Sequence, residues 1–341
     1  MPDSGPELSL TLHRSVAEIP AADWDACADS GNPFVSHAFL AALEASGSAC
    51  SRTGWLPQHA ALRDAAGELL ACCPAYAKSH SQGEYVFDYG WADAFERAGG
   101  SYYPKLQVCS PFSPVPGPRL LVRPGAGIGP AALGQGLVQA CGQLDLSSVH
   151  ITFCQEAEWT ALGEAGWLQR LGTQFHWHNQ GYATFDDFLG ALASRKRKAI
   201  KRERRDAAAS GYVLKTLRGH EITEKHWKAF HRFYRSTTDK KWGRSAYLTP
   251  RFWPLMAEAL GDEVVLMVAE QDGEPVAGAQ GEHKIARGYL PQTTYSAHYI
   301  ADPSLRRAVA DYLRRERQYV AEAVRELTEA GPFRKAADKP A

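Results

Sequence analysis

The chain has 341 residues, of which 45% are hydrophobic and 22% are charged, and its 38 basic residues balance its 38 acidic ones. A net charge of zero excludes a uniformly basic nucleic-acid coat and an acidic solubilising protein. The length is typical of about two domains, each large enough to bury its own core.

No apolar run reaches the roughly 18–20 residues that a membrane-spanning helix needs. Residues 1–10 lack the basic and apolar regions of a signal peptide. The seven cysteines form no C-x-x-C pair, which indicates reduced and mostly buried thiols. We therefore expect a cytoplasmic protein without a membrane span.

The first half of the chain predicts a strand, two helices and a hairpin, followed by strands that alternate with helices. Strand segments alternate apolar and polar residues, whereas helical segments repeat apolar residues every three to four positions. The predicted strands span residues 8–15, 59–64, 68–75, 105–109, 148–153 and 168–182. The predicted helices span residues 21–28, 36–45, 131–144 and 156–164.

The second half predicts the same order after one long helix at residues 184–210. Its strands are predicted at residues 212–217, 264–270 and 275–279, and its other helices at 224–236, 250–260 and 303–327. Asp272–Gly273 is a strong turn signal between the last two strands. The repeated order predicts an architectural duplication. We expect an α/β fold with mixed sheets flanked by helices, and domains at residues 1–183 and 184–341.

A strongly basic segment lies within the long predicted helix. Eight of the eleven residues from Arg195 to Arg205 are basic. This segment is either a solvated basic face or a face that binds the phosphates of tRNA or CoA. Lys196 falls in the middle of the helix's apolar stripe, so its side chain either extends to water or faces a cleft where burial would change its pKa.

A second segment, residues 280–291 (QGEHKIARGYLP), concentrates titratable side chains between glycines and a proline. Residues this close can position one another for general acid–base catalysis. Glu282 or His283 would act as the base, and Lys284 and Arg287 would hold an anionic donor or acceptor, beside Tyr289. The alternative interpretation is a polar surface loop.

Two further segments combine charged and aromatic residues. Residues 84–91 (EYVFDYGW) place Asp88 among aromatic rings, where burial would raise its pKa and make it a base. Ordinary aromatic packing, or stacking of a ligand ring near Trp91, are the alternatives. Trp242 follows two lysines and would either hold a substrate or cover the core. No grouping of residues predicts a metal site.

Three stretches, ASRKRKAIKRERR, DKKWGR and above all QGEHKIARGYLPQTTYSAHYI, resemble the FemAB-like family of GNAT-type N-acyltransferases. The resemblance extends over about residues 32–335. It implies two tandem GNAT-like halves and a link to peptidoglycan biosynthesis. The implied reaction transfers an acetyl or aminoacyl group from acetyl-CoA, another acyl-CoA or aminoacyl-tRNA to an amine on a small molecule or peptide, without a metal or DNA.

The resemblance and the patterns above together select the candidate site residues. Catalytic roles are expected for Glu282, His283, Lys284, Arg287 and Tyr289. Substrate-binding roles are expected for Lys196, Arg195, Lys198, Trp242, Asp88 and Trp91.

The sequence departs from the family's pattern by an apparent internal shortening between Ala279 and Gln280. The family places a further strand–helix–strand unit there, about 30 residues, so we expect a truncated second half. Such a unit would supply the helix N-terminus that holds a pyrophosphate. Three functions remain open: an N-acyltransferase of the FemAB type, a non-catalytic protein that binds tRNA or another polyanion, and a degenerate paralogue without activity. In the shortened enzyme, the first half would hold the donor and the second would contribute only the GEHK segment and the basic helix.

Overall fold

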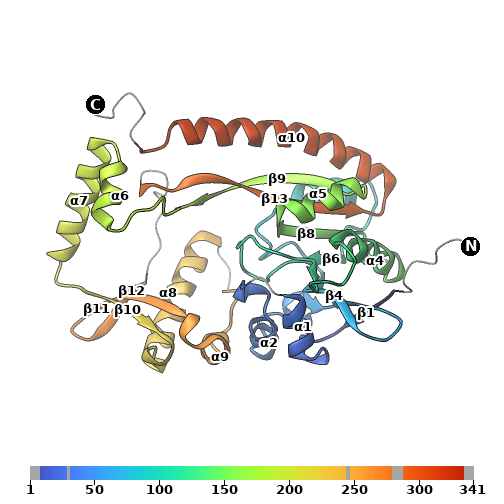
Figure 1. Ribbon diagram of the computed structural model, residues 1–341, viewed down its shortest axis with the longest axis horizontal. Helices are drawn as coiled ribbons and strands as arrows, with labels where there is room; N and C mark the ends of the chain where they lie inside the picture. Colours follow the sequence, from blue (N-terminus) through green and yellow to red (C-terminus); the bar gives the residue numbers. More distant parts are fainter. Residues whose placement is uncertain (1–7, 29–30, 243–245, 279–286, 334–341) are drawn as a thin grey trace, which may run out of the picture.

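The computed structural model describes residues 8–28, 31–242, 246–278 and 287–333 (Figure 1). Strands in these ranges form three sheets. The first sheet contains, in spatial order, β1 (Ser9–His13), β3 (His59–Arg63), β4 (Leu69–Cys73) and β7 (Leu121–Val122). The second contains β2 (Trp55–Pro57), β5 (Ala75–Lys78), β6 (Lys105–Val108), β8 (Ser148–Cys154), β13 (Leu290–Ile300) and β9 (Leu168–His176). The third contains β10 (Val213–Arg218), β11 (Val265–Gln271) and β12 (Glu274–Gly278).

Helices flank these sheets, so the predicted α/β class is confirmed. The helices of the first half are α1 (Ala21–Cys27), α2 (His37–Ala45), α3 (Tyr89–Arg97), α4 (Pro130–Gln143) and α5 (Glu156–Glu164). Those of the second half are α6 (Phe185–Ala191), α7 (Ser194–Ala208), α8 (Glu224–Trp242), α9 (Phe252–Leu260) and α10 (Pro303–Glu329). α10 runs along β9 and β13 for most of their length (Figure 1).

The predicted duplication is confirmed and extends to individual residues. In each half a 3-10 helix follows the first strand and ends at an isoleucine, Ile19 or Ile222. Five residues later, the next helix buries a tryptophan, Trp24 in α1 and Trp227 in α8. The first strand of each half then pairs antiparallel with the first strand of its hairpin.

Strand β13 belongs to the second half by sequence but completes the sheet of the first half. It lies between β8 and β9 and pairs antiparallel with both. Among the described residues, the sheet of the second half therefore contains only β10, β11 and β12, in agreement with the predicted truncation. The domain division between residues 183 and 184 stays a prediction. β13 and α10 belong to the second predicted domain by sequence, but they pack against the sheet of the first.

One apolar cluster joins the two halves. It combines residues of α1 and α2 with residues of α8, α9 and β11. The rings of Phe39 in α2 and Phe252 in α9 meet edge to face, with centroids 5.9 Å apart. Beside them, the Thr249 hydroxyl donates to the carbonyl of Ser46 at 3.0 Å. The halves therefore share a core and do not simply adjoin.

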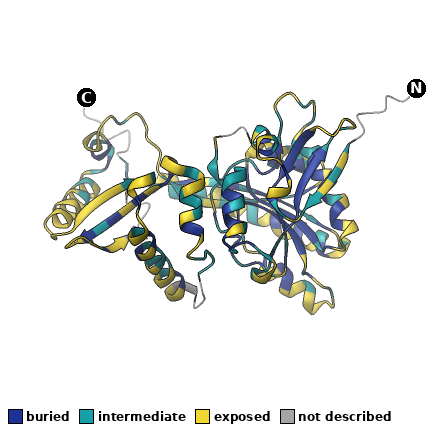
Figure 2. Cartoon of the chain, turned by 90° about the horizontal axis from the view of Figure 1, so that it is seen from below, coloured by how far each residue is buried: buried dark blue, intermediate teal, exposed yellow. Residues whose placement is uncertain are grey.

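The single helix predicted at residues 184–210 is wrong, because the structure divides it into α6 and α7. Leu192 between them has an extended backbone, is fully buried and forms a bridge with Phe333. Past this break the apolar stripe is reduced to Ile200, which packs partly buried against Phe188, Leu189 and Leu192, and α7 contains no buried residue. Lys196 is accordingly exposed and not part of a buried stripe. Figure 2 shows that the side of the molecule with α7 and the three-stranded sheet is more exposed than the side with the other two sheets.

Replacing Phe252 with alanine should lower the free energy of unfolding by about 3–5 kcal/mol, because it opens a cavity in the shared core. Both halves should lose stability in one transition, measured by urea unfolding with fluorescence and circular dichroism. Tyr319→Ala, at a residue that is 73% exposed, is the control and should have little effect. A loss below about 1 kcal/mol for Phe252→Ala would contradict the shared core.

Candidate functional site

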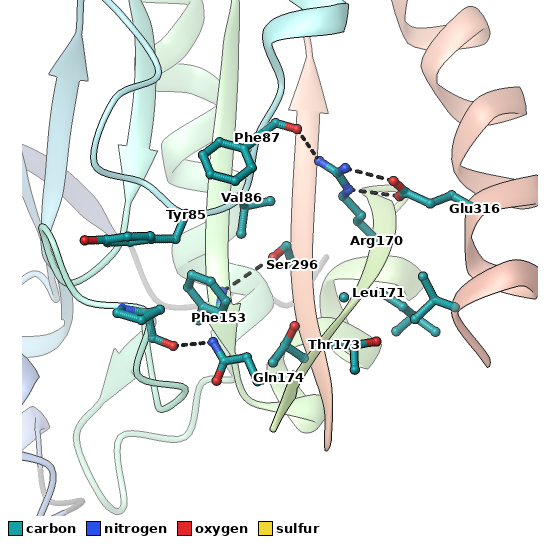
Figure 3. A pocket seen from close by; sticks show the side chains of 14 residues that line it. Tyr85, Val86, Phe87, Phe153, Arg170, Leu171, Thr173, Gln174, Ser296 and Glu316 are labelled. Carbon is teal, nitrogen blue, oxygen red and sulfur yellow. Dashed lines mark hydrogen bonds and ion pairs between the residues drawn. The ribbon is translucent and has the colours of Figure 1, made fainter. Parts of the chain in front are cut away.

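A groove opens over the six-stranded sheet where β8, β13 and β9 lie side by side (Figure 3). Its volume is about 300 Å³. The segment before α3 contributes Tyr85 and Phe87, and α10 contributes Glu316. Thr294 and Ser296 of β13 add hydroxyl groups. The groove therefore combines aromatic surface with small polar groups, as ligand sites commonly do.

Two bulky residues of this groove have strained backbones. Tyr85 has φ 61° and Phe153, at the end of β8, has φ 56°. Such values are rare for side chains of this size and persist only where the surrounding structure enforces them. The N–H of Phe153 donates to Ser296 Oγ at 3.5 Å, which is long for a hydrogen bond. The Phe153 N–H is therefore only weakly satisfied by Ser296.

Arg170 of β9 fixes one wall of the groove. Its guanidinium donates twice to the Glu316 carboxylate, at 2.9 and 2.8 Å, and once to the carbonyl of Phe87 at 2.9 Å (Figure 3). It also lies 5.2 Å from the ring centroid of Trp91. Because Glu316 neutralises Arg170, this wall carries no net charge.

Lys105 of β6 holds the segment that carries Tyr85 and Phe87 from inside the protein. Its fully buried ammonium donates to Glu84 at 2.7 Å, to Asp88 at 2.5 Å and to Ser81 at 2.8 Å. Burial alone would lower the pKa of Lys105, but the two carboxylates raise it above its ordinary value. The ammonium therefore stays charged and uses all three of its donors.

Asp88 is buried as the aromatic setting predicts, but the expected raised pKa is wrong. Burial favours the neutral acid, yet Lys105 and His150 outweigh burial and hold the pKa of Asp88 well below its ordinary value. The Tyr102 hydroxyl donates to the same carboxylate at 2.7 Å. Asp88 is thus a permanent anion, not a base. The raised pKa belongs to Glu84, where burial brings it to about 7.

A second buried lysine lies beside Glu84. Lys78 Nζ is 3.8 Å from Glu84 Oε1 and 3.6 Å from the ring centroid of Trp55. Burial lowers the pKa of Lys78 to about 7. Glu84 and Lys78 therefore both titrate near neutral pH, whereas Lys105 and Asp88 keep their charges.

Two histidines join β13 to β8 beneath the groove. His298 lies directly opposite His150, and their Nδ1 atoms are 2.7 Å apart, so only one of these atoms carries the shared proton. Burial lowers the pKa of His150 to about 3 and also lowers that of His298 well below its ordinary value. The Trp91 ring meets His298 edge to face at 5.0 Å. The pair is therefore neutral at physiological pH.

Two other predicted site residues, Arg287 and Tyr289, lie at the opposite end of β13. Arg287, just before this strand, pairs with Glu203 of α7 at 3.2 Å. A Cβ atom at Gly288 would lie 2.7 Å from the Phe188 ring of α6, so glycine permits this close approach. Tyr289 follows and is half-buried. The structure thus brings the described end of the polar segment, from Arg287 onward, next to α6 and α7.

The basic face of α7 is open to solvent. Arg195, Lys196 and Lys198 are exposed, and none of them forms an ion pair within the described ranges. Lys201 pairs with Asp186 at 3.3 Å. Several cations are therefore free to bind an anion, although their roles stay predictions.

The two groups of predicted residues do not share one cleft. Arg287 precedes the first residue of β13, Leu290, and a strand rises about 3.3 Å per residue, so Leu290 and His298 lie roughly 26 Å apart along β13. Asp88 and Trp91 lie with His298, at the far end from α7. The sequence treated these residues as one site, and the structure places them at two.

Four predicted site residues lie outside the described ranges or at the edge of one. Glu282, His283 and Lys284 lie outside the described residues, and Trp242 is the last residue of α8. In the described part of the chain, no three His, Cys, Asp or Glu side chains are grouped to hold a metal ion. No helix in that part has both the length and the apolar character needed to cross a bilayer.

Sequence reasoning missed most of the buried network. Lys105 and His150 each lie in a predicted strand, and a buried titratable residue in a central strand requires a partner. That signal was available for both. Arg170 also lies in a predicted strand and carried the same signal, whereas Glu84 and His298 lie outside the predicted strands and carried none.

A family model matches residues 15–279 and 277–335, and its description is peptidoglycan biosynthesis/recognition. The chain belongs to the FemAB-like family. The resemblance seen in the sequence is thereby confirmed. The two matched segments meet at residues 277–279, next to the predicted shortening. No curated protein matches this FemAB-like chain.

Several solved structures are similar over most of the chain. A tandem GNAT protein from the clavulanic acid biosynthesis pathway is 11% identical, with TM-score 0.41, 87% of this chain and 99% of that chain covered. The C-terminal domain of a putative lysylphosphatidylglycerol synthetase from Agrobacterium fabrum is 10% identical, with TM-score 0.39 and coverages of 94% and 78%. A probable N-acyltransferase from Enterococcus faecalis is 9% identical, with TM-score 0.33 and coverages of 88% and 74%. These values are too low to transfer the role of any residue.

Replacing Lys105 with methionine should lower the free energy of unfolding by about 3–5 kcal/mol, because Asp88 would remain buried without its ammonium partner and Glu84 would keep only Lys78. Adding Glu84→Gln and Asp88→Asn should restore part of the loss. Chemical denaturation measures both variants. Lys225→Met, which removes an exposed lysine paired with Glu274, is the control. An effect of Lys105→Met no larger than that of Lys225→Met would contradict the role of the network.

Stability should fall in acid because of the histidine pair. In the unfolded chain a histidine binds a proton at about pH 6.5, whereas folded His150 does so only at about 3. The contribution of His150 to the free energy of unfolding is therefore complete above pH 6.5. It is lost as the pH falls toward 3, by about 1.4 kcal/mol per pH unit for one proton. The variant His150→Gln/His298→Gln should show a shallower decline between pH 6 and 4, measured by urea unfolding. His220→Gln, at an exposed site, should keep the wild-type slope. Equal slopes for wild type and the double variant would refute this assignment.

Proposed function

We propose that the protein is an N-acyltransferase that moves an acyl or aminoacyl group from acyl-CoA or aminoacyl-tRNA to an amine of a peptidoglycan-related acceptor. The observation that carries this proposal is FemAB-like family membership over nearly the whole chain. The groove on β8, β13 and β9 supports it, because it offers a shaped site on rigid strands.

The chemistry needs a donor that stabilises negative charge on the attacked carbonyl oxygen. The Phe153 N–H and the Ser296 hydroxyl, which lie together in the groove, are suited to this role. The amine must be neutral to attack, and the wall formed by Arg170 and Glu316 has no excess carboxylate to keep it protonated. Glu282 or His283 remains our proposed base.

The phosphates of the donor are proposed to bind α7. Arg195, Lys196 and Lys198 are exposed and have no ion pair within the described residues. Closely spaced cations on one helix favour a polyanion, with an affinity that decreases steeply with salt. Lys284 would extend this cationic surface, and Arg287, which pairs with Glu203, lies beside it.

Transfer should be measured with acetyl-CoA and with total aminoacyl-tRNA as separate donors and a stem peptide bearing a free amine as acceptor. His283→Ala or Glu282→Ala should lower the rate by at least about 100-fold, as expected for loss of a general base. His220→Ala is the matched surface control. Wild-type rates in both His283→Ala and Glu282→Ala would refute the assigned base.

The same assay separates the alternative functions. A polyanion-binding protein would bind tRNA in a salt-dependent way but would transfer no group from either donor. Charge reversal at Lys198 and Lys201 would weaken that binding. A cooperatively folded protein that neither binds nor transfers would be a degenerate paralogue.

A further inference from the structure

A second groove lies between α8 and α9 in the C-terminal half, away from the groove on the sheet. Its volume is about 610 Å³. Apolar side chains form most of its surface, from Ile222, Trp227, Pro250, Pro254 and Ala257. Ile222 and Trp227 are the isoleucine and tryptophan that recur in the duplication.

The corresponding place in the first half is closed. Trp24 has no exposed surface, and its indole N–H donates to the carbonyl of Val35 at 2.8 Å. Trp227 lines the open groove, and no described residue accepts a hydrogen bond from its indole. The duplicated helix pair therefore encloses a filled core in one half and an accessible cavity in the other.

A histidine donor lines the groove with a fixed orientation. The Trp253 indole donates to His231 Nδ1 at 3.0 Å. Because Nδ1 accepts this bond, the ring proton is on Nε2. Burial, together with Arg235, lowers the pKa of His231, which keeps the ring neutral. His231 Nε2–H is thus available as a donor to a ligand.

The groove also carries an uncompensated positive charge. Arg251 lines it, is exposed and has no carboxylate partner among the described residues. Lys228 also lines it, but pairs with Glu224 at 2.7 Å. With that pair neutral, Arg251 leaves the groove cationic beside an apolar surface.

We propose that the groove between α8 and α9 binds an anionic amphiphile, a small molecule with a carboxylate or phosphate head and an apolar chain. The head accepts from Arg251 and His231, and the chain packs on Trp227 and the two prolines. This site does not depend on acyl transfer, so it stands or fails independently of the proposed function.

Isothermal titration calorimetry on the full chain with decanoate, decyl phosphate and decanol tests the proposal. At least one of the two anions should bind about tenfold or more tightly than decanol, because a charged hydrogen bond is worth about tenfold or more in affinity. The tighter of the two anions identifies the preferred head group. Arg251→Gln should weaken anion binding about tenfold and leave decanol unchanged.

Two further variants guard against misfolding and nonspecific binding. Ala257→Phe fills the groove, and it should weaken binding of the anion at least tenfold while the thermal transition is retained. Arg232→Gln removes an exposed charge from the same helix outside the groove and should bind as wild type does. The proposal is overturned if neither anion binds, if decanol binds as tightly as both, or if Ala257→Phe binds unchanged.

Discussion

Strand β13 enters the N-terminal sheet between β8 and β9, and neither neighbour reaches the other without it. Withdrawing it would expose the backbone donors and acceptors of two strands at once, a large cost in a buried sheet. It would also remove one of the two strands on which α10 packs and separate His298 from His150. A segment that belongs to the second half in sequence thus completes the first half in space.

The groove on the sheet exists because of this insertion. Thr294 and Ser296 come from β13, Arg170 from β9 and Phe153 from β8. On the inner side, Lys105 fixes the segment that contributes Tyr85 and Phe87. A buried ion network is a weak source of net stability, but breaking it is costly. Its structural effect is to hold the segment with the strained residue Tyr85 at the groove in one arrangement.

Local patterns in the sequence predict local elements well. α5 occupies the predicted residues 156–164 without a shift, and the hairpin β3–β4 lies where alternation and the turn place it. The break at Leu192 depends on Phe333, more than a hundred residues later, and has no local signal. β13 was missed because its polar sequence, QTTYSAHYI, lies between two strands that only the tertiary fold brings together.

The same distinction applies to the site. The high density of charged residues in the sequence indicated the basic helix and Arg287 as candidate site residues, and the structure brings them together. The network of Lys105, Glu84 and Asp88 assembles from residues on separate elements, so only Asp88 was selected, and with the wrong pKa. Where partners are distant in sequence, residue type alone predicts burial but not the charge state.

Native-state hydrogen exchange of the β13 amides tests the central claim most directly. If β13 is integral to the sheet, its central amides should exchange only through global unfolding, with the same free energy as those of β8. Exchange of β13 at a much lower free energy, while β8 stays protected, would show that the strand detaches on its own and would contradict this account.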